Sequence, residues 1–226
     1  LFRSAAYPTN QPVGLTPLQT EPFNSALPAS SRSAESLVAA PAREVSETID
    51  GLTLPKKGDK NVIPATLYAR PFSRKADQHL LTFVITDVGL SQASLPLLMT
   101  LPREVTLAIS PYTRGSAAMV ETLRNAGFEV WTSLPMMGAR YPQDDPGPLG
   151  LIGSMPVEEI LRRLREIMAA TPGSVGFVFP PDEALSAKRE AMLPVLKAIE
   201  ARGLYMLSTH PTRSIGQITK EAALES

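Results

Sequence analysis

The sequence predicts an α/β fold built on a mostly parallel sheet whose strands are connected by helices. Short apolar, β-branched runs recur between residues 80 and 208, and helical patterns alternate with them. Strands that alternate with helices usually pair in parallel, because a helical crossover returns the chain to the same end of the sheet. Five strands in about 150 residues fit either an open doubly wound sheet or part of a (β/α) barrel.

Five runs carry the strand pattern, and the first is the longest. Residues 80–86, with the sequence LLTFVIT, are expected to form a strand covered on both faces. The other four runs also combine β-branched, aromatic and aliphatic residues, and lie at 104–109, 128–132, 175–179 and 204–208.

Three helices are predicted between these strands. Residues 116–126 stop at Gly127, which favours a helix end. Residues 193–202 have Pro194 in the opening turn. The clearest helix is residues 156–170, where acidic residues complement the N-terminal dipole and an apolar stripe follows at helical spacing. The stripe consists of Val157, Ile160, Leu161, Leu164, Ile167 and Met168.

The polar face of the 156–170 helix predicts ion pairs. Glu158 is four residues before Arg162, and Glu159 is four residues before Arg163. This pattern is typical of a solvated helix face rather than an anion site.

Residues 1–60 predict a largely disordered linker rich in Pro, Ser and Ala, and residues 61–226 the folded domain. The 22 prolines of the chain are about twice the usual share and recur early among small and polar residues. Such a segment buries too little apolar area to offset an ordering entropy of about 1–2 kcal/mol per residue. A weak helical window at 34–49 is divided by Pro41.

Composition excludes several kinds of site. The chain has no Cys, so disulfides and thiolate zinc sites are excluded, and only His79 and His210 offer imidazole. Lys and Arg number 22 and balance 22 Asp and Glu, so no nucleic-acid partner is expected. No apolar run is long enough to span a bilayer. Because the sequence begins at Leu1, an omitted N-terminal anchor stays open.

The carboxyl ends of the predicted strands supply the first candidate site residues. Asp87 directly follows the first apolar run and precedes Gly89, where the backbone can turn sharply. The plainer interpretation of Asp87 is a residue that caps the next turn or helix. His210 follows the fifth run and suits a ligand or general acid–base role, although a loop His before Pro211 is more often merely solvated.

Residues 141–150 form a second candidate site. Three prolines restrict this stretch, and the adjacent carboxylates of Asp144 and Asp145 suit a cation or sugar hydroxyls. The plainer interpretation is a rigid crossover connection.

An ordered series of motifs spans roughly residues 66–210. It comprises YARPF at 68–72, VITDVGLS at 84–91, LP at 101–102 with VTLAISPY at 105–112, AGFEV at 126–130, LPM at 134–136 and YPQDDPGPL at 141–149. Together these stretches resemble the divergent polysaccharide deacetylase family of Gram-negative bacteria. The resemblance implies the deformed (β/α) barrel of carbohydrate deacetylases, here short at the C-terminus. It also implies a periplasmic, inner-membrane-anchored envelope protein with a proline-rich linker.

The resemblance also assigns roles to individual residues. In related metal-dependent deacetylases a divalent ion, often zinc, activates water while an Asp takes the proton. The metal ligand falls on Asp87, and the base falls on Thr86, whose hydroxyl cannot accept a proton at neutral pH. A family His becomes Ser133, and the Asp after the fifth strand becomes Ser208. A catalytic metal needs about three protein ligands, so Asp87 alone does not hold one.

Three hypotheses follow. The first is a catalytically degenerate envelope protein that needs no cofactor and binds a glycan or a protein at the strand ends. The second is an active zinc-dependent deacetylase of an amino-sugar polymer, with a rebuilt site drawn from Asp87, Asp144, Asp145 and His210. The third is a structural subunit docked into an envelope assembly by its proline-rich arm. The candidate site residues are Asp87, Thr86, Ser133 and His210 for chemistry, and Tyr112, Tyr141, Asp144 and Asp145 for substrate binding.

Overall fold

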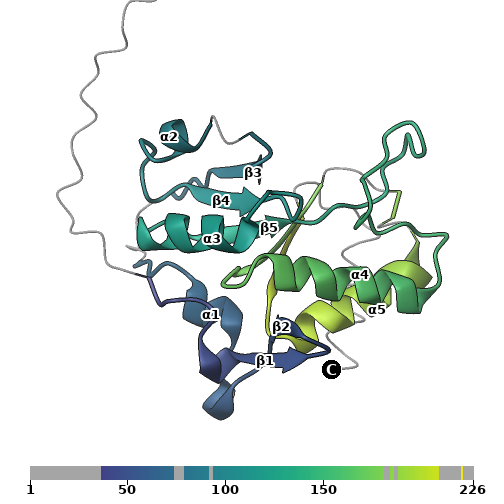
Figure 1. Ribbon diagram of the computed structural model, residues 1–226, viewed down its shortest axis with the longest axis horizontal. Coiled ribbons are helices and arrows are strands. Elements are labelled where there is room, and N and C mark those ends of the chain that lie inside the picture. The colour runs from purple at the N-terminus through teal and green to yellow at the C-terminus, as the bar shows by residue number, and fades with distance from the viewer. Residues whose placement is uncertain are drawn as a thin grey trace, which may run out of the picture. The chain divides into compact units, whose positions relative to one another are not determined.

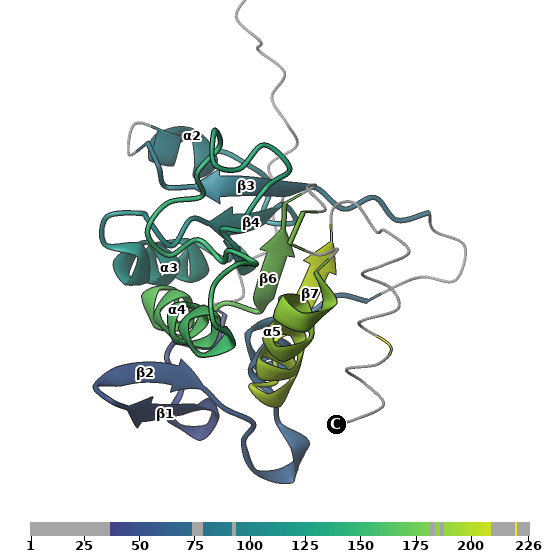
Figure 2. The same cartoon turned by 90° about the vertical axis from the view of Figure 1, so that its right-hand side faces the viewer.

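A computed structural model describes residues 37–73, 79–91, 94–180, 184–185, 188–208 and 220. In this part of the chain, five parallel strands form one sheet in the order β3-β4-β5-β6-β7 (Figure 1 and Figure 2). The predicted α/β class is confirmed, and the sheet is consistent with the barrel that the sequence resemblance implies. The strands are β3 (Val84–Val88), β4 (Thr106–Ile109), β5 (Val130–Ser133), β6 (Gly176–Phe179) and β7 (Tyr205–Ser208).

Helices form the crossovers between the later strands. α3 (Ser116–Asn125) joins β4 to β5, α4 (Val157–Ala170) joins β5 to β6, and α5 (Arg189–Ala201) joins β6 to β7. All three predicted helices are therefore present. α5 begins earlier than expected, so Pro194 lies inside the helix rather than in its opening turn. Two short helices lie before and after β3, namely α1 (Pro64–Tyr68) and α2 (Leu95–Leu98).

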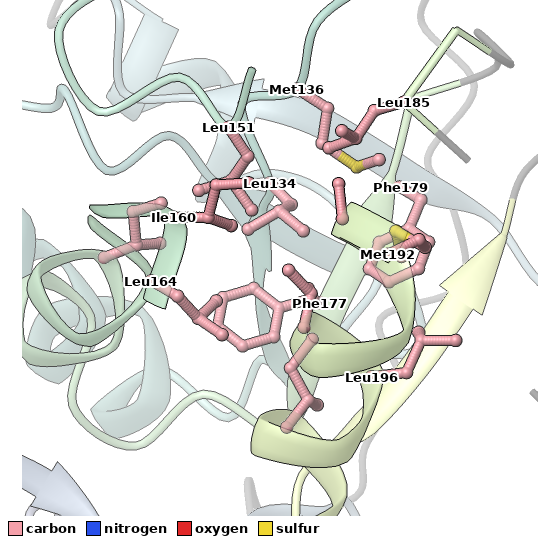
Figure 3. Close-up of a cluster of buried hydrophobic side chains, with 14 of the residues drawn as sticks. Leu134, Met136, Leu151, Ile160, Leu164, Phe177, Phe179, Leu185, Met192 and Leu196 are labelled. Atoms are coloured by element: carbon pink, nitrogen blue, oxygen red, sulfur yellow. The ribbon is translucent and has the colours of Figure 1, made fainter. Parts of the chain in front are cut away.

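The largest buried cluster lies between α4, α5 and the second half of the sheet. The predicted stripe of α4 faces this cluster, with Ile160, Leu164 and Ile167 at 1% exposed or less. In Figure 3, Leu164 lies beside the ring of Phe177 from β6. Full burial of such a side chain stabilises the fold by about 1.5–3 kcal/mol, so this stripe anchors α4 on the sheet.

A second buried cluster supports the first half of the sheet. Leu107 and Ile109 of β4 pack with Val120 and Leu123 of α3, and all four are 1% exposed or less. This packing covers one face of the strands whose carboxyl ends carry the candidate site residues.

The sequence predicts a largely disordered linker over residues 1–60, and this prediction is wrong for residues 37–60. A short 3-10 helix leads into an antiparallel hairpin of β1 (Ser46–Ile49) and β2 (Leu52–Pro55), and a second 3-10 helix spans Asp59–Asn61. The hairpin lies beside α4 (Figure 2), and Leu54 of β2 belongs to the largest buried cluster. The weak helical window at 34–49 is replaced by this arrangement, because the apolar residues of the hairpin find a tertiary partner in α4.

Arg124 fastens this N-terminal segment to α3. Its side chain is 2% exposed. Nη1 donates to the carbonyl oxygens of Tyr68 (2.9 Å) and Gly173 (3.1 Å), and Nη2 donates to the carbonyl oxygen of Val38 (2.8 Å). Burial lowers the pKa of Arg124, and the guanidinium carbon lies 4.8 Å from the centre of the Tyr68 ring. Three segments distant in sequence therefore meet at one guanidinium.

The expectation that the first strand is covered on both faces is also wrong. β3 starts at Val84, later than the apolar run begins, and Leu81, Phe83 and Ile85 are 79%, 61% and 37% exposed. β3 lies at the edge of the sheet, with β4 as its one partner strand among the described residues. An apolar run indicates a strand, but its position in the sheet decides how much of it is covered.

Within the described residues, no helix has both the length and the apolar character required to cross a bilayer.

Candidate functional site

The first part of the candidate site lies where β3 ends. Asp87 adopts a left-handed φ of 56°, which is uncommon for a residue with a side chain, and Gly89 follows with φ 95°. The pairing of β3 with β4 shifts register between Ile85 and Val88. The strand therefore bends at Asp87, whose side chain is exposed. Such local strain motivates a functional hypothesis when it falls at a strand end.

Ser133 fixes the backbone at this bend. Its hydroxyl oxygen, on β5, accepts a hydrogen bond from the Asp87 N–H at 2.9 Å and donates to the carbonyl oxygen of Ala108 on β4 at 3.3 Å. Ser133 is 8% exposed, so one buried hydroxyl joins the main chains of β3 and β4. The structure thus brings Asp87 and Ser133 together, with the Ser133 hydroxyl occupied by backbone partners. Thr86 lies on β3 and is exposed.

The loop after β4 closes over the end of β3. The N–H of Ser110 and the hydroxyl of Thr113 both donate to the carbonyl oxygen of Val88 at 3.0 Å. A Cβ at Gly89 would lie 2.4 Å from the Thr113 hydroxyl oxygen, so this close approach requires glycine. Buried hydroxyl groups therefore join the carboxyl ends of β3, β4 and β5, and the exposed carboxylate of Asp87 lies at this edge of the sheet.

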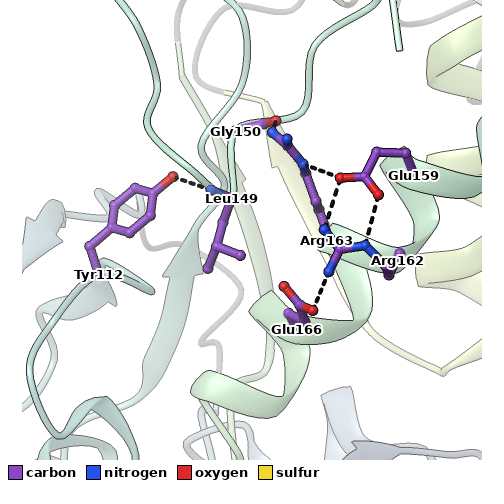
Figure 4. Close-up of polar contacts among 7 residues, drawn as sticks. All are labelled: Tyr112, Leu149, Gly150, Glu159, Arg162, Arg163 and Glu166. Carbon is purple, nitrogen blue, oxygen red and sulfur yellow. Dashed lines mark hydrogen bonds and ion pairs between the residues drawn. The ribbon is translucent and has the colours of Figure 1, made fainter. Parts of the chain in front are cut away.

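Tyr112, from the same loop, reaches the segment that follows β5. Its hydroxyl accepts a hydrogen bond from the N–H of Leu149 at 3.1 Å (Figure 4). The same hydroxyl donates to the carbonyl oxygen of Pro146 at 2.7 Å. Burial raises the pKa of Tyr112, an effect that the Leu149 N–H and the charge of Arg163 partly offset. Tyr112 and residues 141–150, which the sequence singled out separately, are therefore in contact.

The acidic residues of this loop have partners within the loop itself. Asp144 forms an ion pair with Arg140, and Asp145 accepts a hydrogen bond from the N–H of Gly147 at 2.8 Å. Tyr141 is 37% exposed. The contacts of Asp144 and Asp145 thus differ from that of Asp87, whose N–H binds Ser133.

Arg163 is a member of this region that sequence reasoning missed. We expected a solvated pair with Glu159, and its Nε does donate to that carboxylate at 2.8 Å. However, Nη1 also donates to the carbonyl oxygen of Gly150 at 2.7 Å, and the side chain is only 16% exposed. The predicted partner of Arg162 was Glu158; the structure instead pairs Arg162 with Glu159 and Glu166. No sequence signal indicates Gly150, because the contact depends on how the loop folds back.

The donor set of the described strand ends does not fit a divalent metal. No group of three Asp, Glu, His or Cys side chains able to hold a metal ion occurs within the described segments. Asp87 stands among hydroxyl groups, which are weak zinc ligands beside carboxylate and imidazole. His210 lies outside the described residues.

Comparisons with known proteins extend these observations. Residues 83–226 match the model of the family described as divergent polysaccharide deacetylase. The fold is similar to the crystal structure of the uncharacterized protein ATU2773 from Agrobacterium tumefaciens C58. That similarity has a TM-score of 0.71 and 28% sequence identity, and it covers 76% of this chain and 71% of the other. No curated protein matches the chain significantly.

Proposed function

Because the chain belongs to the divergent polysaccharide deacetylase family, we propose that it acts on the envelope polysaccharides of a Gram-negative bacterium as a binding protein. In this proposal a carbohydrate binds at the carboxyl ends of β3, β4 and β5, and the protein does not hydrolyse acetyl groups through a metal. The single observation that carries the proposal is the strand-end bend, which holds the exposed Asp87 carboxylate beside backbone-bound hydroxyls.

The chemistry of this surface suits a sugar. A carboxylate accepts hydrogen bonds from sugar hydroxyls, and the exposed hydroxyl of Thr86 can donate or accept beside it. In the neighbouring loop, which Tyr112 joins to the segment after β4, the exposed ring of Tyr141 offers an apolar face of the kind on which sugar rings stack. The bend at Asp87 is held by the main chain and by Ser133, so the carboxylate is positioned before a ligand arrives.

The same surface is poorly equipped for metal-dependent hydrolysis. Thr86 occupies the position that the family resemblance gives to the base, and a threonine hydroxyl does not accept a proton at neutral pH. Ser133 occupies the position of a family His, and its hydroxyl already has two backbone partners. These substitutions support binding over turnover.

The test combines binding, metal content and turnover on the full chain. We expect N-acetylglucosamine hexamer, or its deacetylated form, to bind in calorimetry. We also expect the purified protein to contain substoichiometric zinc and to release no acetate. Asp87→Asn should weaken binding by about tenfold to a hundredfold, since loss of a hydrogen bond to a charged group costs about 1.5–3 kcal/mol.

Asp50→Asn is the matched control, because Asp50 has a similar left-handed φ of 51° and lies in the β1–β2 turn. It should leave binding unchanged. Stoichiometric zinc together with acetate release that Asp87→Asn abolishes would overturn the proposal in favour of an active deacetylase.

The cellular location is a separate part of the proposal and rests on the family resemblance. Fractionation of cells that express the complete gene product should recover the protein with the periplasm or inner membrane. Recovery with the cytoplasm would contradict it.

A further inference from the structure

Residues 138–150 form a loop whose two ends meet. The N–H of Met137 donates to the carbonyl oxygen of Leu151, and the N–H of Leu151 donates to the carbonyl oxygen of Pro135, both at 2.9 Å. Leu151 is fully buried and Met136 is 6% exposed. The base of the loop is thereby part of the core, in the manner of a compact surface loop with close ends.

Tyr112, which follows β4, binds the main chain in the second half of this loop. One hydroxyl group serves two main-chain partners, the carbonyl oxygen of Pro146 and the N–H of Leu149. Gly147 has a left-handed φ of 89°, and a Cβ there would lie 2.9 Å from the Tyr112 hydroxyl oxygen. The loop backbone therefore lies directly against the phenol, with no space for a side chain between them.

Arg163 fastens the same loop from the side of α4. Figure 4 shows its guanidinium between Gly150 and Glu159. The Nε of Arg163 donates to the carboxylate of Glu159 at 2.8 Å, and hydrogen bonds from Arg162 and Arg163 lower the pKa of Glu159 to about 2. Nη1 of the Arg163 guanidinium also donates to the carbonyl oxygen of Gly150 at 2.7 Å. Two residues from different elements thus bind main-chain groups of one loop.

The hydrogen bonds of Tyr112 and Arg163 leave the tip of the loop exposed to solvent. Residues 139–145 are exposed, and neither Tyr112 nor Arg163 uses a side chain of the tip. The main chain is held and the tip side chains are presented. Ordering a loop costs about 1–2 kcal/mol per residue, so a loop held in advance spares a ligand that cost.

We propose that Tyr112 and Arg163 are positioning residues that hold residues 138–150, called the arm below, in one conformation before the carbohydrate binds. The second half of this statement rests on the proposed function, and the first half does not. Neither residue needs to touch the sugar. Their effect on binding is indirect and acts through the conformation of the arm.

The first experiment needs no ligand. Hydrogen exchange of the full chain is followed in peptides that cover residues 138–151. Tyr112→Phe removes one hydroxyl and keeps the ring, and it should speed exchange of the Leu149 amide about fivefold to tenfold. Tyr205→Phe is the matched control, because Tyr205 is an exposed tyrosine on β7. It should leave exchange in the arm unchanged.

A second pair of variants tests the other fastening. Arg163→Lys keeps the charge but replaces the planar fork, which pairs with Glu159 and Gly150 together, by a point charge. It should speed exchange in the arm, whereas Arg165→Lys, at an exposed position of α4, should not. Unchanged exchange in both Tyr112→Phe and Arg163→Lys overturns the proposal, even where the native protein binds the oligosaccharide.

The carbohydrate readout separates the two proposals. With N-acetylglucosamine hexamer as the probe, Tyr112→Phe should raise the dissociation rate several-fold while Tyr205→Phe does not. If the variants exchange faster in the arm but the native protein does not bind the oligosaccharide, the proposed function is contradicted. The role of Tyr112 and Arg163 in holding the arm is then still supported. The positioning role is overturned if Tyr112→Phe speeds exchange in the arm and the native protein binds the oligosaccharide, but the variant dissociates from it at the native rate.

Discussion

Leu54 offers the sharpest test of how the N-terminal hairpin belongs to the fold. Its side chain lies in β2, is 1% exposed and packs in the largest buried cluster. Leu54→Ala removes the equivalent of about three buried carbon groups, a transfer loss of about 2.4 kcal/mol. The cavity left behind adds to this, so we expect the free energy of unfolding to fall by about 3 kcal/mol, within the range of about 2–5 kcal/mol for buried leucines.

Urea unfolding of the full chain measures this change. Leu97→Ala is the matched control, because the same chemical change at a side chain that is 69% exposed should cost less than about 0.5 kcal/mol. The slope of the transition should stay the same in both variants. A loss below about 1 kcal/mol in Leu54→Ala would refute the reasoning, because it would mean that the hairpin unfolds independently of α4 and the sheet.

Two further predictions concern the bend at Asp87 and the burial of Tyr68. Asp87→Gly should raise the free energy of unfolding by about 0.5 kcal/mol, because relief of the left-handed backbone slightly exceeds the entropy cost of glycine; a loss above 1 kcal/mol in urea unfolding would show that the carboxylate itself supports the fold. Burial raises the pKa of Tyr68 above its ordinary value of 10.0, so the stability it contributes is fully present below about pH 10 and is lost as pH rises through the folded-state pKa. Tyr68→Phe should cost about 1 kcal/mol at pH 7, through loss of the acceptor for the Ala42 N–H, and should flatten the fall in stability above pH 10. Parallel curves for the native chain and Tyr68→Phe between pH 9 and 11 would contradict this.

The sequence was most informative where a pattern is local. The stripe of α4 repeats at helical spacing over four turns, so both its existence and its buried face could be predicted. The five strands were recognised because β-branched and aromatic runs have few other uses. Asp87 could be predicted as a site residue because the end of a strand can be located once the strand itself is predicted. The family resemblance depended on motifs and their order along the chain.

Prediction failed where the outcome depends on a partner elsewhere in the chain. Residues 46–55 look like part of a linker, yet they form a hairpin because Leu54 has a place in the cluster that includes α4. Arg163 looks like a surface ion pair, yet it also binds the carbonyl oxygen of Gly150, thirteen residues away.

The order of strands and helices, the amphipathic character of α4 and the candidate status of Asp87 all follow from residues close together in the chain. Tertiary structure alone decided that β3 lies at an edge with its apolar residues exposed, that Ser133 reaches the Asp87 backbone, and that Tyr112 meets Leu149. The physical reason is that periodicity reports the local backbone and the side a residue faces. Coverage and hydrogen-bond partners, by contrast, are set by which distant segments the closed fold brings together.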